Sequence, residues 1–218
     1  MREDADNPTV APLIYTKTPD GLDLPVIDFT NPRFWVADDV RSFEAQQDAF
    51  LEWDRSRRRL PKFMMRFLLR RAAKRSRLLR ALFQSETGYL DSISTYVLKL
   101  GADNLPPGFD SPVDKRVAAS LHVVLMRLRM QQVAKLVADA LAPALSADAT
   151  APLHLINIAG GPALDSLNTL LMLNRDRPDL LKRPILIHVL DAQAEGPSFG
   201  ANALNALRQT GGPLRSRH

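Results

Sequence analysis

The chain has 218 residues, of which 45% are hydrophobic, and a formal net charge of +5; this suits one large domain, or one domain with an appendage, that buries a core. It contains no cysteine, which excludes disulfides, thiolate nucleophiles and Cys-based metal sites. Its first residues are polar and acidic rather than signal-like, and no apolar run is long enough to cross a bilayer, so we expect a cytoplasmic protein.

Residues 1–35 are predicted to form an extended N-terminal segment. Prolines interrupt this zone repeatedly and break any helix there; they are Pro8, Pro12, Pro19, Pro25 and Pro32. One short strand is expected within LPVIDFT, residues 24–30.

The second zone, residues 36–148, is predicted to be a helical region. One helix is expected over about residues 39–58, and a second follows Pro61, which suits a first-turn position. A third is expected over residues 86–100, where apolar residues recur at helical spacing and Gly101 can end the helix in a left-handed conformation.

A link rich in proline and glycine precedes a fourth, long helix. Ser111 is its expected N-cap and Pro112 lies in its first turn. The helix is expected to end near Pro143. Its apolar stripe consists of Leu121, Val124, Leu125, Leu128, Val133, Leu136, Val137 and Leu141.

The run from Arg55 to Arg80 contains many arginines and lysines and no acid. Such a run is typical of a solvated helix face, and it is also typical of a surface that binds nucleic acid or an anionic membrane. On the first interpretation the helix packs through Phe63, Phe67, Leu68, Leu78, Leu79 and Leu82. The sequence leaves both interpretations open, although aromatic side chains that could stack on bases are scarce nearby.

Residues 149–218 change to an order of strand, helix, strand and helix. The apolar run LHLINIA, residues 153–159, predicts a buried strand, and RPILIHVLD, residues 183–191, predicts a second one. A helix is expected after each strand, over residues 161–176 and 198–209. This order predicts a parallel sheet with a right-handed crossover.

The turn between the first of these strands and its helix contains Gly160 and Gly161. The first amides of a helix lack carbonyl partners, and the helix dipole adds positive charge there. Such a turn suits a nucleotide or nucleoside, and Asp191, at the end of the second strand, is placed to accept hydrogen bonds from ribose hydroxyls. Alternatively, the two glycines only make a tight connection.

The run AGGPALD does not fit the dinucleotide fingerprint G-x-G-x-x-G. It resembles instead the first motif of the class I S-adenosylmethionine-dependent methyltransferases, an acid followed by G-x-G-x-G. Asn157 takes the place of the acid, Ala159, Gly161 and Ala163 take the three glycine places, and Gly160 lies between the first two. HVLDAQ resembles the second motif of the family, with Asp191 as the ribose-binding acid. The resemblance covers about residues 150–210.

This resemblance implies an α/β fold, in which a helical N-terminal region precedes the first βαβα unit of a Rossmann-like methyltransferase sheet. It also implies S-adenosylmethionine as cofactor, bound by Asn157, Ala159, Gly160, Gly161, Ala163 and Asp191, and a methyl acceptor of unknown identity, with a small molecule favoured over nucleic acid. The family's sheet normally has seven strands, and the sequence supplies two. We therefore expect a fragment that is incomplete at its C-terminus, for which activity and inactivity both stay open, or a subunit completed by another chain or by a second copy.

No catalytic base can be assigned from the sequence, and no metal site is expected. His122 is expected to be a packed or surface residue, whereas His154 and His188 are expected to face a helix layer or the sheet edge; their scattered spacing gives no ligand set. Packing is favoured for Tyr89 and Tyr96, and a solvated helix edge for Arg127 and Arg129. Two other functions stay open: a basic helical protein that binds nucleic acid or a membrane surface through Arg55–Arg80, and a non-catalytic subunit completed by a partner chain.

Overall fold

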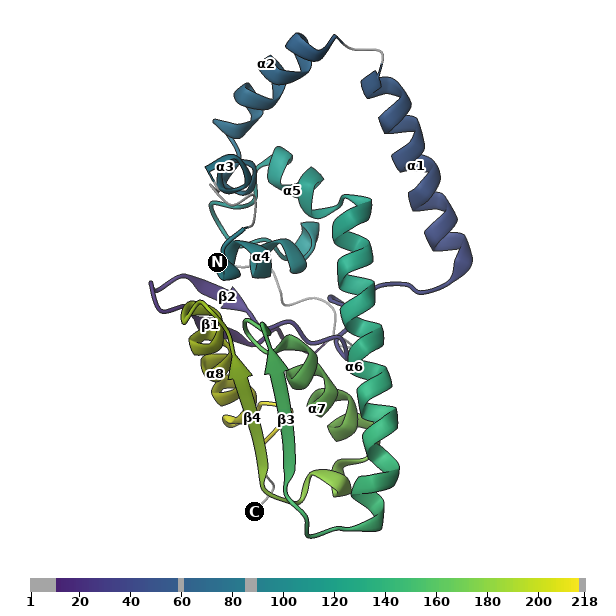
Figure 1. Ribbon diagram of the computed structural model, residues 1–218, viewed down its shortest axis with the longest axis vertical. Helices are drawn as coiled ribbons and strands as arrows, with labels where there is room; N and C mark the ends of the chain where they lie inside the picture. Colours follow the sequence, from purple (N-terminus) through teal and green to yellow (C-terminus); the bar gives the residue numbers. More distant parts are fainter. Residues whose placement is uncertain (1–10, 59–60, 85–89, 216–218) are drawn as a thin grey trace. The chain divides into compact units, whose positions relative to one another are not determined.

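The computed structural model describes residues 11–58, 61–84 and 90–215 (Figure 1). These residues form a mixed α/β structure, mostly helical, with two sheets of two strands each. The chain divides into two compact units. One, the α/β unit, comprises the described residues of Met1–Trp35 and Arg129–His218; the other, the helical unit, is Val36–Leu128. Within the described ranges, no helix has both the length and the apolarity needed to cross a bilayer.

The helical unit contains the first five α-helices, a short 3₁₀ helix and the beginning of a sixth α-helix. They are α1 (Val40–Arg58), α2 (Lys62–Ala73), α3 (Arg77–Gln84), α4 (Ser92–Lys99), η1 (Ala102–Asn104), α5 (Pro112–Ala118) and α6 (Leu121–Ala147). The prediction of a helix over residues 39–58 is confirmed. The predicted N-cap is confirmed as well, because the Ser111 hydroxyl accepts from the Asp114 N–H at 3.1 Å.

Two predicted helices are each divided in the structure. The basic run after Pro61 forms α2 and α3, and the helix expected from Ser111 to about Pro143 forms α5 and α6, of which α6 continues past Pro143 to Ala147. The helix expected over residues 86–100 begins later, at Ser92, because Asp91 caps it by accepting from the Ser94 N–H at 2.7 Å. Residues 86–89 of that prediction lie outside the described residues.

A buried carboxylate explains why the basic run is broken. Asp114 is fully buried and accepts from the Leu78 N–H at 3.0 Å, as well as from the hydroxyls of Ser76 and Ser111 at 2.5 and 2.6 Å. These bonds join the start of α3 to the start of α5. A buried carboxylate needs such partners. Because Asp114 holds the Ser76 hydroxyl and the Leu78 N–H, a new helix begins here after α2.

The α/β unit contains two sheets, two α-helices and a 3₁₀ helix besides the rest of α6. They are β1 (Tyr15–Lys17), β2 (Asp23–Pro25), β3 (Leu153–Ile158), α7 (Leu164–Asp176), η2 (Pro178–Leu181), β4 (Ile185–Leu190) and α8 (Glu195–Arg208). β1 and β2 are antiparallel; β1 was not expected, and β2 is shorter than the strand predicted in residues 24–30. β3 and β4 are parallel, in register from Leu153↔Ile185 to Ile158↔Leu190, which confirms the two predicted strands.

The N-terminal segment is part of the α/β unit, whereas the sequence predicts it as a separate extended zone. Asn168 of α7, fully buried, accepts from the Phe29 N–H at 2.8 Å and donates to the Ile27 carbonyl at 3.1 Å. Val26 packs in the core of this unit with Leu167, Leu171, Ala203 and Leu207. These contacts tie residues 26–29 to helices more than a hundred positions later.

One face of the β3–β4 sheet is exposed. Successive side chains point to opposite faces of a strand. On the inner face Leu153 and Leu155 are buried, and Ile187 packs on the core of this unit. The exposed side chains of the outer face, the open face, belong to His154, Ile156, Ile158, Leu186, His188 and Leu190.

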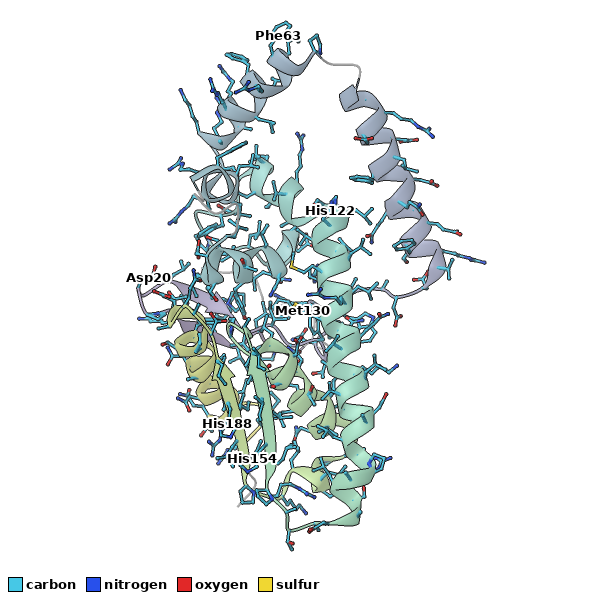
Figure 2. All side chains as sticks on the ribbon, viewed as in Figure 1. Asp20, Phe63, His122, Met130, His154 and His188 are labelled. Atoms are coloured by element: carbon cyan, nitrogen blue, oxygen red, sulfur yellow. The ribbon has the colours of Figure 1, made fainter. Side chains whose placement is uncertain are left out.

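His154 and His188 lie side by side on the open face (Figure 2). Their rings are stacked with centroids 5.3 Å apart, and His154 Nδ1 is 3.1 Å from His188 Nε2. The sequence predicted that these histidines would face a helix layer or the sheet edge. Neither position is correct in the structure, where both side chains are exposed.

Candidate functional site

The candidate site is the turn that leads from β3 into α7, residues 159–163. Ala159, Gly161 and Ala163 have φ values of 53°, 49° and 54°, in the left-handed region. These are the three positions that align with the glycines of the methyltransferase motif. Across the described residues, Ala159 and Ala163 are the two non-glycine residues with positive φ. Because a left-handed alanine costs about 1–2 kcal/mol, the fold holds this turn in a conformation that alanine disfavours.

Close approach of neighbouring atoms limits the size of the residues around the turn. A Cβ atom added to Gly160 would lie 2.5 Å from the Cβ of Asn157. One added to Gly200, in α8, would lie 2.5 Å from the carbonyl oxygen of Pro162. The turn is therefore packed against the end of β3 and against α8. Sequence reasoning missed Gly200, although a glycine inside a helical pattern was the available signal.

Asp191, directly after β4, is bonded to this turn. Its Oδ2 accepts from the Gly161 N–H at 2.7 Å, and its Oδ1 accepts from the Gln193 N–H at 3.0 Å. The hydrogen bonds from the Gln193 and Gly161 amides hold the pKa of this carboxyl below its ordinary value. Asp191 is therefore an ionised acceptor at neutral pH, and the structure brings Gly161 and Asp191 into direct contact.

Asn157, which takes the place of the motif acid, bonds to the helix. Its Nδ2 donates to the Ser166 hydroxyl of α7 at 2.7 Å. This bond fixes the end of β3 against the first turns of α7. The helix itself begins without a side-chain cap, because Ala163 occupies the N-cap position. Backbone amides, rather than side chains, therefore define the start of α7.

The sequence also singled out His122, Tyr96, Arg127 and Arg129, which the structure places as follows. In the helical unit, the His122 ring packs edge-on against Phe50 with centroids 5.6 Å apart, and Tyr96 is buried, as the packing interpretation predicted. Arg127 is half-buried next to Gly101, and burial lowers the pKa of its guanidinium. Arg129 is exposed. Tyr89 lies outside the described residues.

Two pockets lie elsewhere in the α/β unit. One, of about 1310 Å³, is lined by Ile185 at the amino end of β4, by Leu181 of η2 and by Arg208 at the end of α8, so it lies at the opposite end of the strand from Asp191. A smaller one, of about 480 Å³, lies between β1 and α8. The candidate turn lines neither of them. In the part of the chain that the structure describes, no group of three His, Asp or Glu side chains is placed to hold a metal ion.

Comparison of the chain with family models, curated proteins and solved structures gave no match. The chemistry of the turn is therefore the basis on which a function is inferred. The turn offers main-chain N–H groups at a helix start together with an ionised carboxylate on the adjacent strand. This combination can bind a ligand that has both anionic or carbonyl oxygens and hydroxyl groups. Apart from Asp191, whose carboxylate accepts from Gly161 and Gln193, residues 159–163 contain no side chain that could take a proton from an acceptor.

Proposed function

We propose that the chain carries the cofactor-binding turn of an S-adenosylmethionine-dependent methyltransferase, within a Rossmann-like unit. The observation that carries the proposal is the coincidence of the left-handed residues Ala159, Gly161 and Ala163 with the three glycine positions of the resembling motif. Asp191 supports it from the adjacent parallel strand, because it ends that strand and bonds to Gly161.

The residues present suit this cofactor in their chemistry, because they combine main-chain amides with an ionised carboxylate. The proposed binding set is Asn157, Ala159, Gly160, Gly161, Ala163 and Asp191. In this proposal Asp191 accepts from the ribose hydroxyls, and the amides at the start of α7 face the amino acid end. Gly161 adopts the left-handed backbone conformation of this turn without a side chain. Asn157 holds the end of β3 in place through Ser166.

When bound, S-adenosylmethionine supplies an activated methyl group on its sulfonium. The protein then has to hold this donor in line with an acceptor. Because this proposal assigns Asp191 to the ribose hydroxyls and residues 159–163 offer no other base, it favours an acceptor that is already nucleophilic, and a small molecule over nucleic acid. The cysteine-free sequence agrees with a reducing compartment, and we propose the cytoplasm as the location.

Titration calorimetry of the full chain with S-adenosylmethionine and with its demethylated product tests the proposal. Asp191→Ala is expected to weaken binding roughly tenfold or more, because a hydrogen bond to a charged group contributes about 1.5–3 kcal/mol. Asp176→Ala is the matched control: it removes an exposed carboxylate of the same unit, paired with Arg175 at 2.7 Å. Failure of the unaltered chain to bind either ligand would reject the proposal, as would equal effects of the two substitutions.

The open face favours a second candidate function, that of a subunit completed by a second copy of this chain. Ile156, Ile158, Leu186 and Leu190 are 67%, 81%, 41% and 60% exposed. Parallel sheets are normally covered on both faces. The open face carries no Asp, Glu, Lys or Arg, so two copies can bring it together about a two-fold axis without repulsion between like charges.

Light scattering coupled to size-exclusion chromatography tests this second function. A dimer is expected, and the double variant Ile158→Ser/Leu190→Ser is expected to be monomeric. Leu136→Ser is the control, since Leu136 of α6 is 67% exposed but lies away from the sheet. A monomeric unaltered chain, or a dimer that persists in the double variant, would remove this candidate.

A further inference from the structure

Helix α2 leaves its large apolar side chains uncovered. Phe63 is 73% exposed and Phe67 is 65% exposed, with Met64, Leu68 and Leu69 at 41%, 47% and 37%. Figure 2 shows Phe63 near the N-terminal end of this helix. The sequence interpretation in which Phe63, Phe67 and Leu68 pack the basic helix is therefore wrong for these three residues; Leu78 of α3 is buried as expected.

The apolar side chains of α2 form a stripe. Phe63 and Phe67 are one helical turn apart, and so are Met64 and Leu68, which makes two neighbouring rows on the same side of the helix. Four adjacent exposed apolar side chains form the kind of patch that marks an interaction site. The structure covers this stripe with no other part of the described chain, because each of the four side chains is exposed.

Basic side chains lie beside the stripe and at its C-terminal end. Arg66, Arg70 and Lys74 form the row beside Phe63 and Phe67, and Arg71 continues the Phe63–Phe67 row by one more turn. All four are exposed, and α2 contains no acidic residue. The long stems of arginine and lysine can lie along apolar surface while their charges reach outward. A partner that matches this helix therefore needs an apolar layer next to a dense layer of negative charge.

A bilayer with anionic headgroups has this arrangement of layers. A nucleic acid backbone would pair with the arginines, but it offers nothing that removes the Met64 and Leu68 side chains from water. A short amphipathic helix with basic residues on its polar side and Phe and Leu on the other lies in the plane of the membrane interface. The length of α2, 12 residues, suits such a helix and is far below a membrane span.

We propose that α2 is an interfacial helix that binds the protein to the surface of an anionic phospholipid membrane. Phe63, Met64, Phe67 and Leu68 enter the boundary between headgroups and acyl chains. Arg66, Arg70, Arg71 and Lys74 pair with lipid phosphates, each adding attraction to the anionic surface. This surface is independent of the proposed methyltransferase function, since it uses none of the residues of the candidate turn.

Vesicle co-sedimentation with the full chain tests the proposal. Binding is expected to mixed phosphatidylcholine–phosphatidylglycerol vesicles, much weaker binding to phosphatidylcholine alone, and a decline as salt rises from about 0.1 M to 1 M. Arg66→Gln/Arg70→Gln is expected to weaken partitioning about thirtyfold. Phe63→Ser/Phe67→Ser is expected to weaken it about a hundredfold or more.

Matched controls separate α2 from general surface effects. Lys115→Gln/Arg116→Gln removes two exposed charges from α5, and Leu136→Ser removes an equally exposed apolar side chain from α6. Both control proteins are expected to bind vesicles as the unaltered chain does. All of the altered side chains are exposed, so circular dichroism is expected to show the same helical content throughout.

A fluorescent reporter distinguishes insertion from simple charge attraction. In a background without Trp35 and Trp53, Phe63→Trp is expected to shift its emission to the blue on anionic vesicles, and Leu136→Trp is not. A single-stranded DNA oligonucleotide serves as the competing partner. The proposal is overturned if anionic vesicles are not bound, if the Phe63→Trp emission does not move, or if DNA binds and the phenylalanine variants have no effect on vesicles.

Discussion

Replacing Ala159 by glycine is expected to stabilise the α/β unit, although it removes a methyl group. Ala159 has a φ of 53° and is exposed. Glycine relieves about 1–2 kcal/mol of left-handed strain and costs about 0.5–1 kcal/mol in chain entropy. The expected net gain is about 0.5–1 kcal/mol, or about 1–4 °C in Tm for a chain of this size.

Ala163→Gly provides an internal comparison. Ala163 has nearly the same φ, 54°, but it is 4% exposed. Removing its buried methyl group costs about 0.8 kcal/mol, and together with the chain-entropy cost of about 0.5–1 kcal/mol this offsets the relieved strain. We therefore expect Ala163→Gly to change stability little. Ala201→Gly, at an exposed position inside α8, is expected to destabilise by about 0.5–1 kcal/mol.

Urea unfolding followed by tryptophan fluorescence measures these differences in one unit. The chain has two tryptophans, and in a Trp53→Phe background the remaining Trp35 belongs to the α/β unit. The expected order of midpoints is Ala159→Gly highest, Ala163→Gly near the parent and Ala201→Gly lowest. If Ala159→Gly lowered the midpoint as much as Ala201→Gly does, residue 159 would not be left-handed and the alignment of the turn with the glycine motif would lose its main support.

Three further predictions concern the packing and titration of the α/β unit. Gly200→Ala is expected to lower stability by about 1–3 kcal/mol in the same urea assay, because its Cβ would lie 2.5 Å from the Pro162 carbonyl oxygen; a neutral result would mean that α8 can move away from the turn. Asn168→Ala is expected to cost about 1–3 kcal/mol and to speed proteolysis near Phe29, whose N–H loses its acceptor; unchanged cleavage by mass spectrometry would contradict this. Asp191 has a lowered pKa in the folded state, so its stabilising contribution is present above its ordinary pKa and lost as the pH falls below about 4; Asp191→Asn is expected to make stability less sensitive to acid in that range, and an unaltered slope would argue against the bonds to Gly161 and Gln193.

The elements that carry the candidate turn were predictable because their signals are local. The apolar runs at residues 153–159 and 183–191 predict strands on their own, and Gly160 and Gly161 mark the turn between strand and helix. The placement of Asp191 opposite that turn follows from parallel pairing, in which carboxyl ends meet at the same edge. The bond between Asp191 and Gly161 agrees with this placement.

The features that sequence reasoning missed depend on contacts between distant residues. The break between α2 and α3 depends on Asp114, which is 38 positions from Ser76. The role of Gly200 depends on how closely α8 approaches Pro162. Neither relation leaves a periodic pattern in the sequence, so propensity alone predicted one continuous helix and an ordinary glycine.

The buried face of α6 also differs from the predicted apolar stripe. Leu136 was expected in the apolar stripe and is 67% exposed, whereas Ala134, Ala138 and Ala142 are buried. The small side chain of Ala134 lets α7 come close enough for the Thr169 hydroxyl to donate to the Ala134 carbonyl at 3.3 Å. Hydrophobicity ranks leucine above alanine, but close helix packing selects for small size.

The hydrogen bonds between Asn168 and residues 27–29 have a consequence for folding during translation. The Phe29 amide and its acceptor on Asn168 are separated by 139 positions. At translation rates of about 5–20 residues per second, roughly 7–28 seconds pass between the synthesis of the two. During that interval the nascent segment that includes Val26 and Phe29, both buried in the finished protein, has no native surface on which to settle. Its apolar residues are then available to chaperones, and the α/β unit can close only after α7 has left the ribosome.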